Sequence, residues 1–301
     1  ATLAAAQAPA NESICDYYTT AVFKNNTAAN QLTLLTLLVN TAVIGSYSPS
    51  ANKSVVVPGI LNPNGTYNGT PVNLVPYFSG ALASTNDGGA VGVKKNFLDG
   101  GGAAPLMNNT PANDMTSNQY FLLTHLYEFF GLLLGCSEVG MTGYPAYSGD
   151  GSMYDVHKFM VLDTAENDYF ITQVALSAQS FGVAPADITK VGAALNLYFN
   201  NRCGAPVTVV PGMGNLTQSI CTDASCPLAA NSNCTGQAAV AIPSGAASAP
   251  AASGSAAATG TGSAAAAGSS GSAAAKPASA GRVGSSIAAG LFGLVGLVVI
   301  A

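Results

Sequence analysis

Apolar side chains recur every three or four positions in two stretches of this chain, which predicts α-helices. In the first stretch, 12–44, two such patterns follow one another, and the second, NQLTLLTLLVNTAVIG, is apolar on most of its circumference. The second stretch opens at Thr116 with NQYFLLTHLYEFFGLLLG and stops at Gly135. Because helices with few polar residues must be buried, both belong to the interior of a folded domain.

Capping residues predict three further helices. Ser152 precedes Asp155 by three positions and Asp163 precedes Glu166 by three, and both spacings are typical of helix N-termini. Pro185 suits the first turn of a last helix, and the short connection before it predicts an antiparallel helical hairpin. Since no segment before the Ala/Ser/Gly-rich part of the chain alternates clearly between apolar and polar residues, the predicted fold class is all-α.

The composition changes abruptly near Ile242. From there almost every residue up to Ser286 is Ala, Ser, Gly, Thr or Pro, so no large side chains are present whose burial would offset the entropy lost on ordering the backbone. The Pro-, Gly- and Asn-rich text after the first helices predicts a long, mostly irregular loop. We therefore expect a helical domain over 1–204 with a loop insertion at about 46–116, a Cys-containing appendix over 205–242, a disordered linker over 243–286 and a hydrophobic tail over 287–301.

The tail, IAAGLFGLVGLVVIA, is an apolar run of 15 residues, shorter than the roughly 20 that a membrane-spanning helix needs. Small residues, a spacer with Lys276 and Arg282 and then this tail follow the order of a glycosylphosphatidylinositol (GPI) signal, in which a lipid in the outer membrane leaflet replaces the tail. The attachment residue is expected within 271–281, with Ser272 and Ser279 as candidates. The alternative is a short membrane helix that stays in place.

Several features favour secretion. The chain opens at Ala1 without the segments of a secretory signal, so such a signal has been cleaved or was never present. Eight Asn-X-Ser/Thr sequons favour cleavage, because a secreted chain displays them on surface loops; they lie at Asn11, Asn25, Asn52, Asn64, Asn68, Asn108, Asn215 and Asn233. We expect an extracellular protein held at the plasma membrane or transferred to the cell wall, where cell-wall polysaccharide is a further candidate partner.

The cysteines fit the same compartment. Six are present, and no His lies near the cluster at 221–234, so three disulfides are expected in place of a metal site. A bridge from Cys15 to Cys203 would tie the ends of the folded domain together, and the later cysteines would staple the appendix. The candidates are Cys15, Cys136, Cys203, Cys221, Cys226 and Cys234.

Charge and motifs exclude some functions. Outside the linker, seven basic residues stand against fourteen acidic ones without a basic run, which excludes nucleic acid as a partner. The chain has no Gly-x-Ser-x-Gly motif and its cysteines are expected in disulfides, so the sequence assigns no catalytic residue.

The two histidines, His125 and His157, each lie in a predicted helix among aromatic and aliphatic neighbours. One interpretation is a pair of core histidines that bond to backbone carbonyls. The other is haem, whose iron takes one or two axial imidazoles and whose porphyrin needs an apolar, aromatic slot. Two His without a third ligand make a poor zinc site.

Four motifs follow one another from the predicted helix that opens at Thr116 onward. EFFGLLLGC at 128–136, the turn Tyr147-Ser148-Gly149, the run Met153-x-x-Val156-His157 and GVAPADITKVGAAL from Gly182 occur in the order found in one globin family. The segment 118–203 thereby resembles a truncated haemoglobin of the first group, here in a fungal-type surface protein. VPYFSG at 75–80 is similar to the aromatic turn that precedes the family's distal helix.

The resemblance implies a globin-like haem site. His157 would be the proximal iron ligand, and His125 would be a sixth ligand or a contact of a haem propionate. Because Leu126 stands where relatives that stabilise oxygen are often polar, a bis-histidyl redox or haem-holding site is favoured over oxygen storage. The other side chains implied to contact haem are Phe78, Leu122, Leu126, Phe129, Met153 and Met160.

Two functions from different classes follow. The first is an extracellular, membrane-anchored haem protein whose partner is haem or a small diatomic ligand, and which serves in redox chemistry, haem capture or ligand handling. The second is a structural or adhesive cell-surface glycoprotein that keeps the helical scaffold and binds no cofactor.

Overall fold

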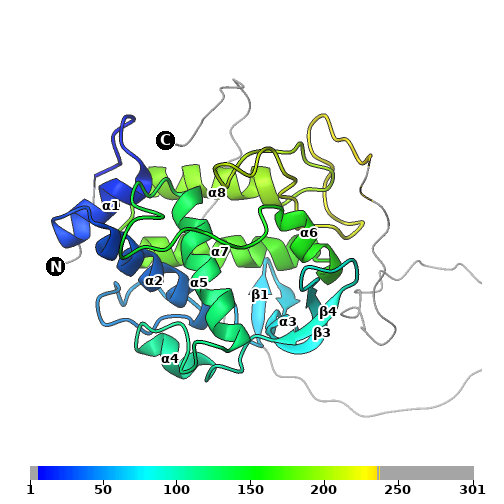
Figure 1. The fold of residues 1–301 in the computed structure, drawn as a ribbon, viewed down its shortest axis with the longest axis horizontal. Helices are drawn as coiled ribbons and strands as arrows, with labels where there is room; N and C mark the ends of the chain where they lie inside the picture. The colour runs from blue at the N-terminus through cyan, green and yellow to red at the C-terminus, as the bar shows by residue number, and fades with distance from the viewer. Residues whose placement is uncertain (1–5, 236, 238–301) are drawn as a thin grey trace, which may run out of the picture. The chain divides into compact units, whose positions relative to one another are not determined.

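The computed structural model describes residues 6–235 and 237, and Figure 1 shows their path. The helices are α1 (Ile14–Phe23), α2 (Ala28–Ile44), α3 (Val75–Phe78), α4 (Ala103–Met107), α5 (Asn118–Leu133), α6 (Met153–His157), the 3-10 turn η1 (Lys158–Met160), α7 (Thr164–Ser180) and α8 (Pro185–Phe199). The strands are β1 (Gly65–Tyr67), β2 (Thr70–Val72), β3 (Ser79–Thr85) and β4 (Val93–Asn96).

The helices begin where the sequence places their caps. At α6, the Ser152 hydroxyl accepts a hydrogen bond from the Asp155 backbone N–H. At α7, Asp163 and Glu166 form a complete capping box, in which each side chain accepts from the other residue's backbone N–H. These caps satisfy amides that have no partner within the first helical turn.

A helical core forms around α2. This helix packs against α5, α7 and α1, and α7 packs along α8 as the predicted hairpin. In Figure 1, α5 crosses in front of α7 and α8, and the strands lie together beside the N-terminal end of α7, next to α6. Five consecutive residues of α5, 127–131, are buried, so protein surrounds the second half of this helix on all sides.

The all-α prediction is wrong, because part of the expected irregular loop forms two small antiparallel sheets. β1 pairs with β2 through the two-residue turn Asn68-Gly69, where both residues have positive φ (47° and 83°). Asn-Gly is the favoured pair for this turn, since both positions need the left-handed region. β3 pairs with β4 with shifts in register, and such interrupted pairing gives no regular alternation in the sequence.

Three disulfides are present, as expected, but the proposed bridge from Cys15 to Cys203 is wrong. Cys15 pairs with Cys136, and the others are Cys203–Cys234 and Cys221–Cys226. The first bridge follows from the packing of α1 on the end of α5, where the Cys15 backbone N–H donates to the Leu134 carbonyl at 3.1 Å. Three disulfides are compatible with an extracellular location.

The Cys-containing segment from residue 205 onward packs back on the helices. The backbone N–H groups of Ile220 and Cys221 both donate to the Phe199 carbonyl at the end of α8. The Tyr154 N–H in α6 donates to the Thr217 carbonyl. Since Val210 and Ile220 are buried in the same hydrophobic cluster as the helices, this segment completes the core.

All eight sequon asparagines lie at the surface, seven of them exposed and Asn52 partly exposed. The predicted linker 243–286, the tail 287–301 and the anchor candidates Ser272 and Ser279 lie outside the described residues. Within the described part, no single helix is long and apolar enough to cross a membrane; α1 and α2 reach that length and hydropathy together but meet at a bend of 97°.

Candidate functional site

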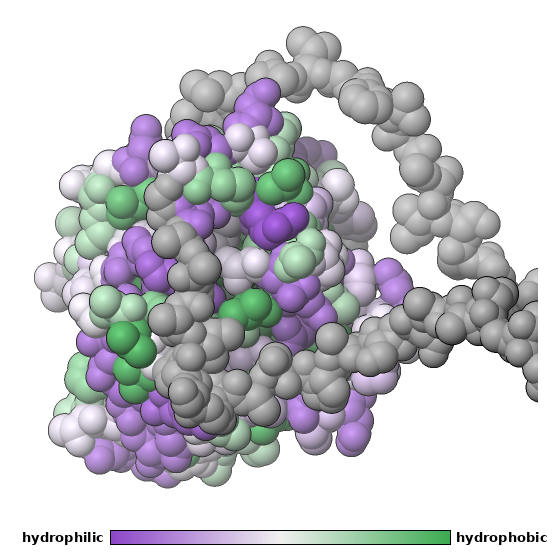
Figure 2. Space-filling model, turned by 90° about the vertical axis from the view of Figure 1, so that its right-hand side faces the viewer, coloured by the Kyte–Doolittle hydropathy of each residue, from purple (hydrophilic) through white to green (hydrophobic). Residues whose placement is uncertain are grey.

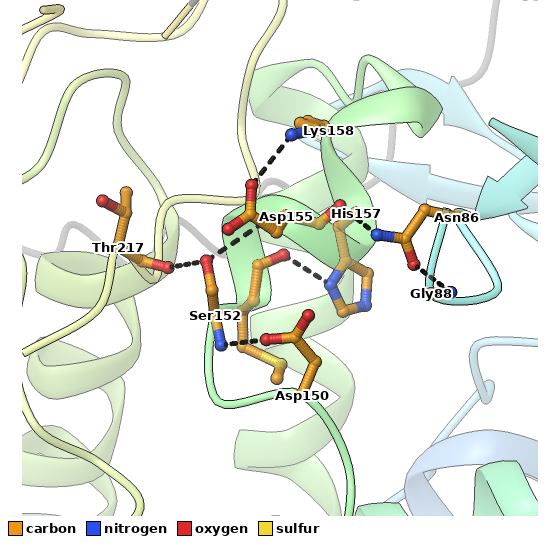
Figure 3. Close-up of polar contacts among 9 residues, drawn as sticks. Asn86, Gly88, Asp150, Ser152, Asp155, His157, Lys158 and Thr217 are labelled. Carbon is orange, nitrogen blue, oxygen red and sulfur yellow. Dashed lines mark hydrogen bonds and ion pairs between the residues drawn. The ribbon is translucent and has the colours of Figure 1, made fainter. Parts of the chain in front are cut away.

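His157 ends α6, a short helix fixed at its start by polar contacts. The Ser152 backbone N–H donates to an Asp150 carboxylate oxygen at 2.8 Å, and the Ser152 hydroxyl donates to the Thr217 carbonyl at 3.0 Å. β3 packs against α6 and η1, and the Asn86 amide that follows β3 donates to the Asp155 carbonyl at 3.4 Å (Figure 3). The orientation of α6 therefore depends on segments that lie both earlier and later in the chain.

The His157 imidazole is held by one of its nitrogens. Nδ1 lies 2.8 Å from the Met153 carbonyl oxygen, one helical turn earlier. A carbonyl only accepts, so Nδ1 carries the hydrogen and Nε2 keeps its lone pair. In Figure 3, Nε2 points away from that carbonyl, and it has no hydrogen-bond partner within 6–235. Burial lowers the pKa of His157, with the Met153 contact acting in the opposite direction, so the neutral form is favoured.

His125, on α5, is engaged by side chains of the following loop. Its Nε2 lies 3.4 Å from the Ser148 hydroxyl, and its ring meets the Tyr147 ring edge-on at 5.5 Å between centroids. Burial lowers the pKa of His125. No hydrogen bond or ring contact joins the two imidazoles in the described part of the chain, and the bis-histidyl arrangement has no support in this geometry.

The other residues implied to contact haem do not form one lining. Leu126 faces an apolar cavity that neither histidine borders, whereas Phe129 packs on Tyr147 and Phe199. Phe78 ends α3, and Met153 and Met160 flank His157 in sequence. Phe78, Leu122, Leu126, Met153 and Met160 are partly buried and Phe129 is fully buried, all in contact with the hydrophobic core.

These positions test whether the residues fit haem. His157 meets one requirement of a single axial ligand, because its Nδ1 hydrogen bond fixes the ring and Nε2 keeps its lone pair, as in metal-ligating histidines. The same contact fits a core histidine, and neither apolar cavity of the described residues borders His157. His125 does not fit a second ligand, because its Nε2 contacts the Ser148 hydroxyl and the Tyr147 ring packs against the imidazole. Among residues 6–235 no group of three or more His, Cys, Asp or Glu side chains could hold a metal ion.

Sequence reasoning missed Glu128, one helical turn after His125. Its side chain is 6% exposed and its Oε2 has no hydrogen-bond partner. Burial raises the pKa of its carboxyl from 4.5 to about 7. Its charge also raises the pKa of Tyr144 and Tyr147, behind the larger effect of burial on both phenols, so the three side chains share one environment. The sequence signal that could identify Glu128 is its position inside the aromatic run YEFF.

Glu128→Gln is expected to remove part of the pH dependence of stability. The folded state keeps a proton that the unfolded chain releases at its lower pKa, so this carboxyl favours folding at low pH and that contribution is lost as pH rises from 4.5 to about 7. The loss amounts to about 3 kcal/mol at most. Urea unfolding at pH 5 and pH 8 measures it: the stability difference between the two pH values should be smaller in the variant, and an equal difference would contradict the assignment.

Asp187 is a second buried carboxylate that the sequence did not single out. It lies in the first turn of α8 and is fully buried. Its oxygens accept from the Ala8 backbone N–H at 2.7 Å, the Tyr18 hydroxyl at 2.8 Å and the Lys190 ammonium at 3.1 Å. The Tyr18 hydroxyl in turn accepts from the Ala184 N–H at 2.8 Å. Asp187 therefore links the N-terminal segment, α1 and α8.

Comparison with known proteins assigns no family. This chain matches no protein-family model, no curated protein and no solved structure.

Proposed function

We propose that this chain is an extracellular glycoprotein whose helical domain binds haem through His157. The observation that carries the proposal is the Nδ1 contact of His157 with the Met153 carbonyl at 2.8 Å, with Nε2 left available. The three disulfides and the surface sequons support an extracellular location.

Each residue has a limited part in this proposal. His157 would supply the imidazole, and Met153 and Met160, which flank it in sequence, would be the candidates for apolar contacts. His125 keeps its contact with Ser148 and serves the packing of α5. When bound, haem would supply an iron centre for redox chemistry or for a small diatomic ligand.

Haemin titration of the full chain tests the proposal. Wild type is expected to give a saturable Soret shift, and His157→Ala should weaken haemin binding at least tenfold because it removes the ligand. His125→Ala is the matched control and should bind haemin within about twofold of wild type. A wild-type spectrum that stays that of free haemin, or equal binding by His157→Ala, would overturn the proposal.

The second candidate is a structural or adhesive surface glycoprotein without a cofactor. It is favoured by the Tyr147 and Ser148 side chains, which fill the position beside His125. On the face shown in Figure 2, hydrophobic residues are scattered among hydrophilic ones, so any adhesive contact on the visible part of this face would be largely polar. The haemin titration separates the two candidates.

A further inference from the structure

An apolar cavity lies among the core helices, on the side of α5 that faces α2 and α7. Its volume is about 70 Å³. Interiors of proteins are close-packed, with few voids larger than a water molecule, so a void of this size in the core is a feature that needs an explanation. The side chains that define it include Leu38, Leu126, Phe130, Phe170, Val174 and Val191.

The helix packing explains why the space stays open. α2 packs against both α5 and α7, and the Phe130 ring of α5 meets the Phe170 ring of α7 at 6.4 Å between centroids, so large rings meet beside the cavity. The Cys15–Cys136 disulfide fixes α1, which contributes a further wall.

The cavity offers almost no polar atom to an occupant. Of its lining side chains, the Tyr18 hydroxyl is bound to Asp187 and the Ala184 N–H. The Ser177 hydroxyl donates to the Leu38 carbonyl at 2.7 Å. Water needs two to four polar partners in a buried site, and apolar cavities accordingly stay dry or bind apolar molecules.

The cavity also reaches the surface. Val22, at the end of α1, is one of its lining residues and is 39% exposed. An apolar ligand can therefore approach beside Val22 without unfolding of the core.

We propose that this cavity is a binding site for a small uncharged hydrocarbon group, such as a short alkyl chain or the last few carbons of a longer one. Its apolar wall excludes ligands that need hydrogen bonds. At about 70 Å³ the cavity is roughly half the size of the 150 Å³ cavity that takes up benzene, so it takes only a few carbons of a slender chain, whose remainder would lie toward the opening beside Val22. This site is separate from the haem proposal, because neither histidine borders it.

Titration of the full chain, with labelled methyl groups, by n-pentane in NMR tests the site. Saturable shifts are expected for the methyl groups of Leu126, Val174 and Val191, whereas the methyl groups of Leu197, which is 69% exposed on α8, should stay unchanged. Val174→Phe fills the cavity and should weaken pentane binding at least tenfold. Leu197→Phe is the matched control and should leave binding unchanged.

A second variant keeps the proposal testable if Val174→Phe fails to fold. Leu126→Ala enlarges the cavity and should bind benzene at least tenfold more tightly than wild type does. The site is refuted if wild type shows no saturable pentane shifts. It is also refuted if a folded Val174→Phe binds pentane as wild type does, or if a folded Leu126→Ala gains no affinity for benzene. Haemin is absent throughout, so failure here is distinct from failure of the haem proposal.

Discussion

Replacing Cys15 and Cys136 together by alanine is expected to lower the free energy of unfolding by about 5 kcal/mol. The two cysteines are 121 positions apart in sequence, so the bridge removes much of the conformational freedom of the unfolded chain. Chain-entropy arguments give a larger effect for longer loops. Urea unfolding of wild type and the double variant under non-reducing conditions measures the difference.

The matched control is the Cys221–Cys226 bridge, which spans only five positions. Its double alanine variant is expected to lose about 2 kcal/mol by the same reasoning. Equal losses for the two bridges would show that loop closure does not set their contributions. If the Cys15/Cys136 double variant lost less stability than the control variant, this would contradict the role given to the Cys15–Cys136 bridge, which is to fasten α1 to the end of α5.

Asp187→Ala is expected to destabilise the fold by about 2 to 6 kcal/mol, because it leaves two buried hydrogen-bond donors without their acceptor. The two buried donors are the Ala8 N–H and the Tyr18 hydroxyl, whereas the Lys190 ammonium, whose side chain is 50% exposed, can turn to water. Buried donors without partners are costly since water no longer reaches them. Thermal or urea unfolding measures the loss.

The matched control is Asp155→Ala. Asp155 also pairs with a lysine three positions later, Lys158, at 2.8 Å, but its side chain is 48% exposed, whereas that of Asp187 is 0% exposed. Exposed pairs contribute about 0 to 1 kcal/mol, so the control should change stability little. Similar losses in both variants would mean that burial does not determine the contribution of Asp187.

Asp187 also predicts a loss of stability in acid. Burial alone would raise the pKa of its carboxyl, but the hydrogen bonds from Ala8, Tyr18 and Lys190 outweigh burial and lower it. A carboxyl with a lowered pKa in the folded state stabilises the fold above its unfolded pKa, and this contribution is lost as pH falls through the lower, folded value. The pKa of Glu128 is shifted in the opposite direction, upward. The stabilising contribution of Asp187 is therefore lost as pH falls, and that of Glu128 is lost as pH rises toward about 7.

Local sequence signals predict the structure where interactions between neighbouring residues decide it. Ser152 and Asp163 mark helix starts because their side chains bond to backbone groups only three positions away. The hairpin of β1 and β2 carried a local signal too, the Asn68-Gly69 pair. The flanking strands of three residues each are too short to show alternation, so the sequence predicts irregular structure there.

The relative positions of the two histidines cannot be predicted from the order of motifs along the chain. The order of motifs from α5 to α8 suggested two imidazoles on either side of one group. Where each ring lies depends on the loop between α5 and α6, and this loop places Tyr147 and Ser148 against His125. No spacing along the chain specifies such a contact, because it joins residues more than twenty positions apart.

The sequence by itself determined the helices α1, α2 and α5 to α8, the caps of α6 and α7, the surface position of the sequons and the use of all six cysteines in disulfides, because these depend on local bonding, apolar periodicity and compartment chemistry. Only the tertiary structure decided which cysteines pair, that β-hairpins fill part of the long insertion, and that Glu128 and Asp187 are buried. It also placed the apolar cavity on one side of α5 and His157 away from it. These properties arise from contacts between distant segments, whose geometry is fixed by how whole helices pack.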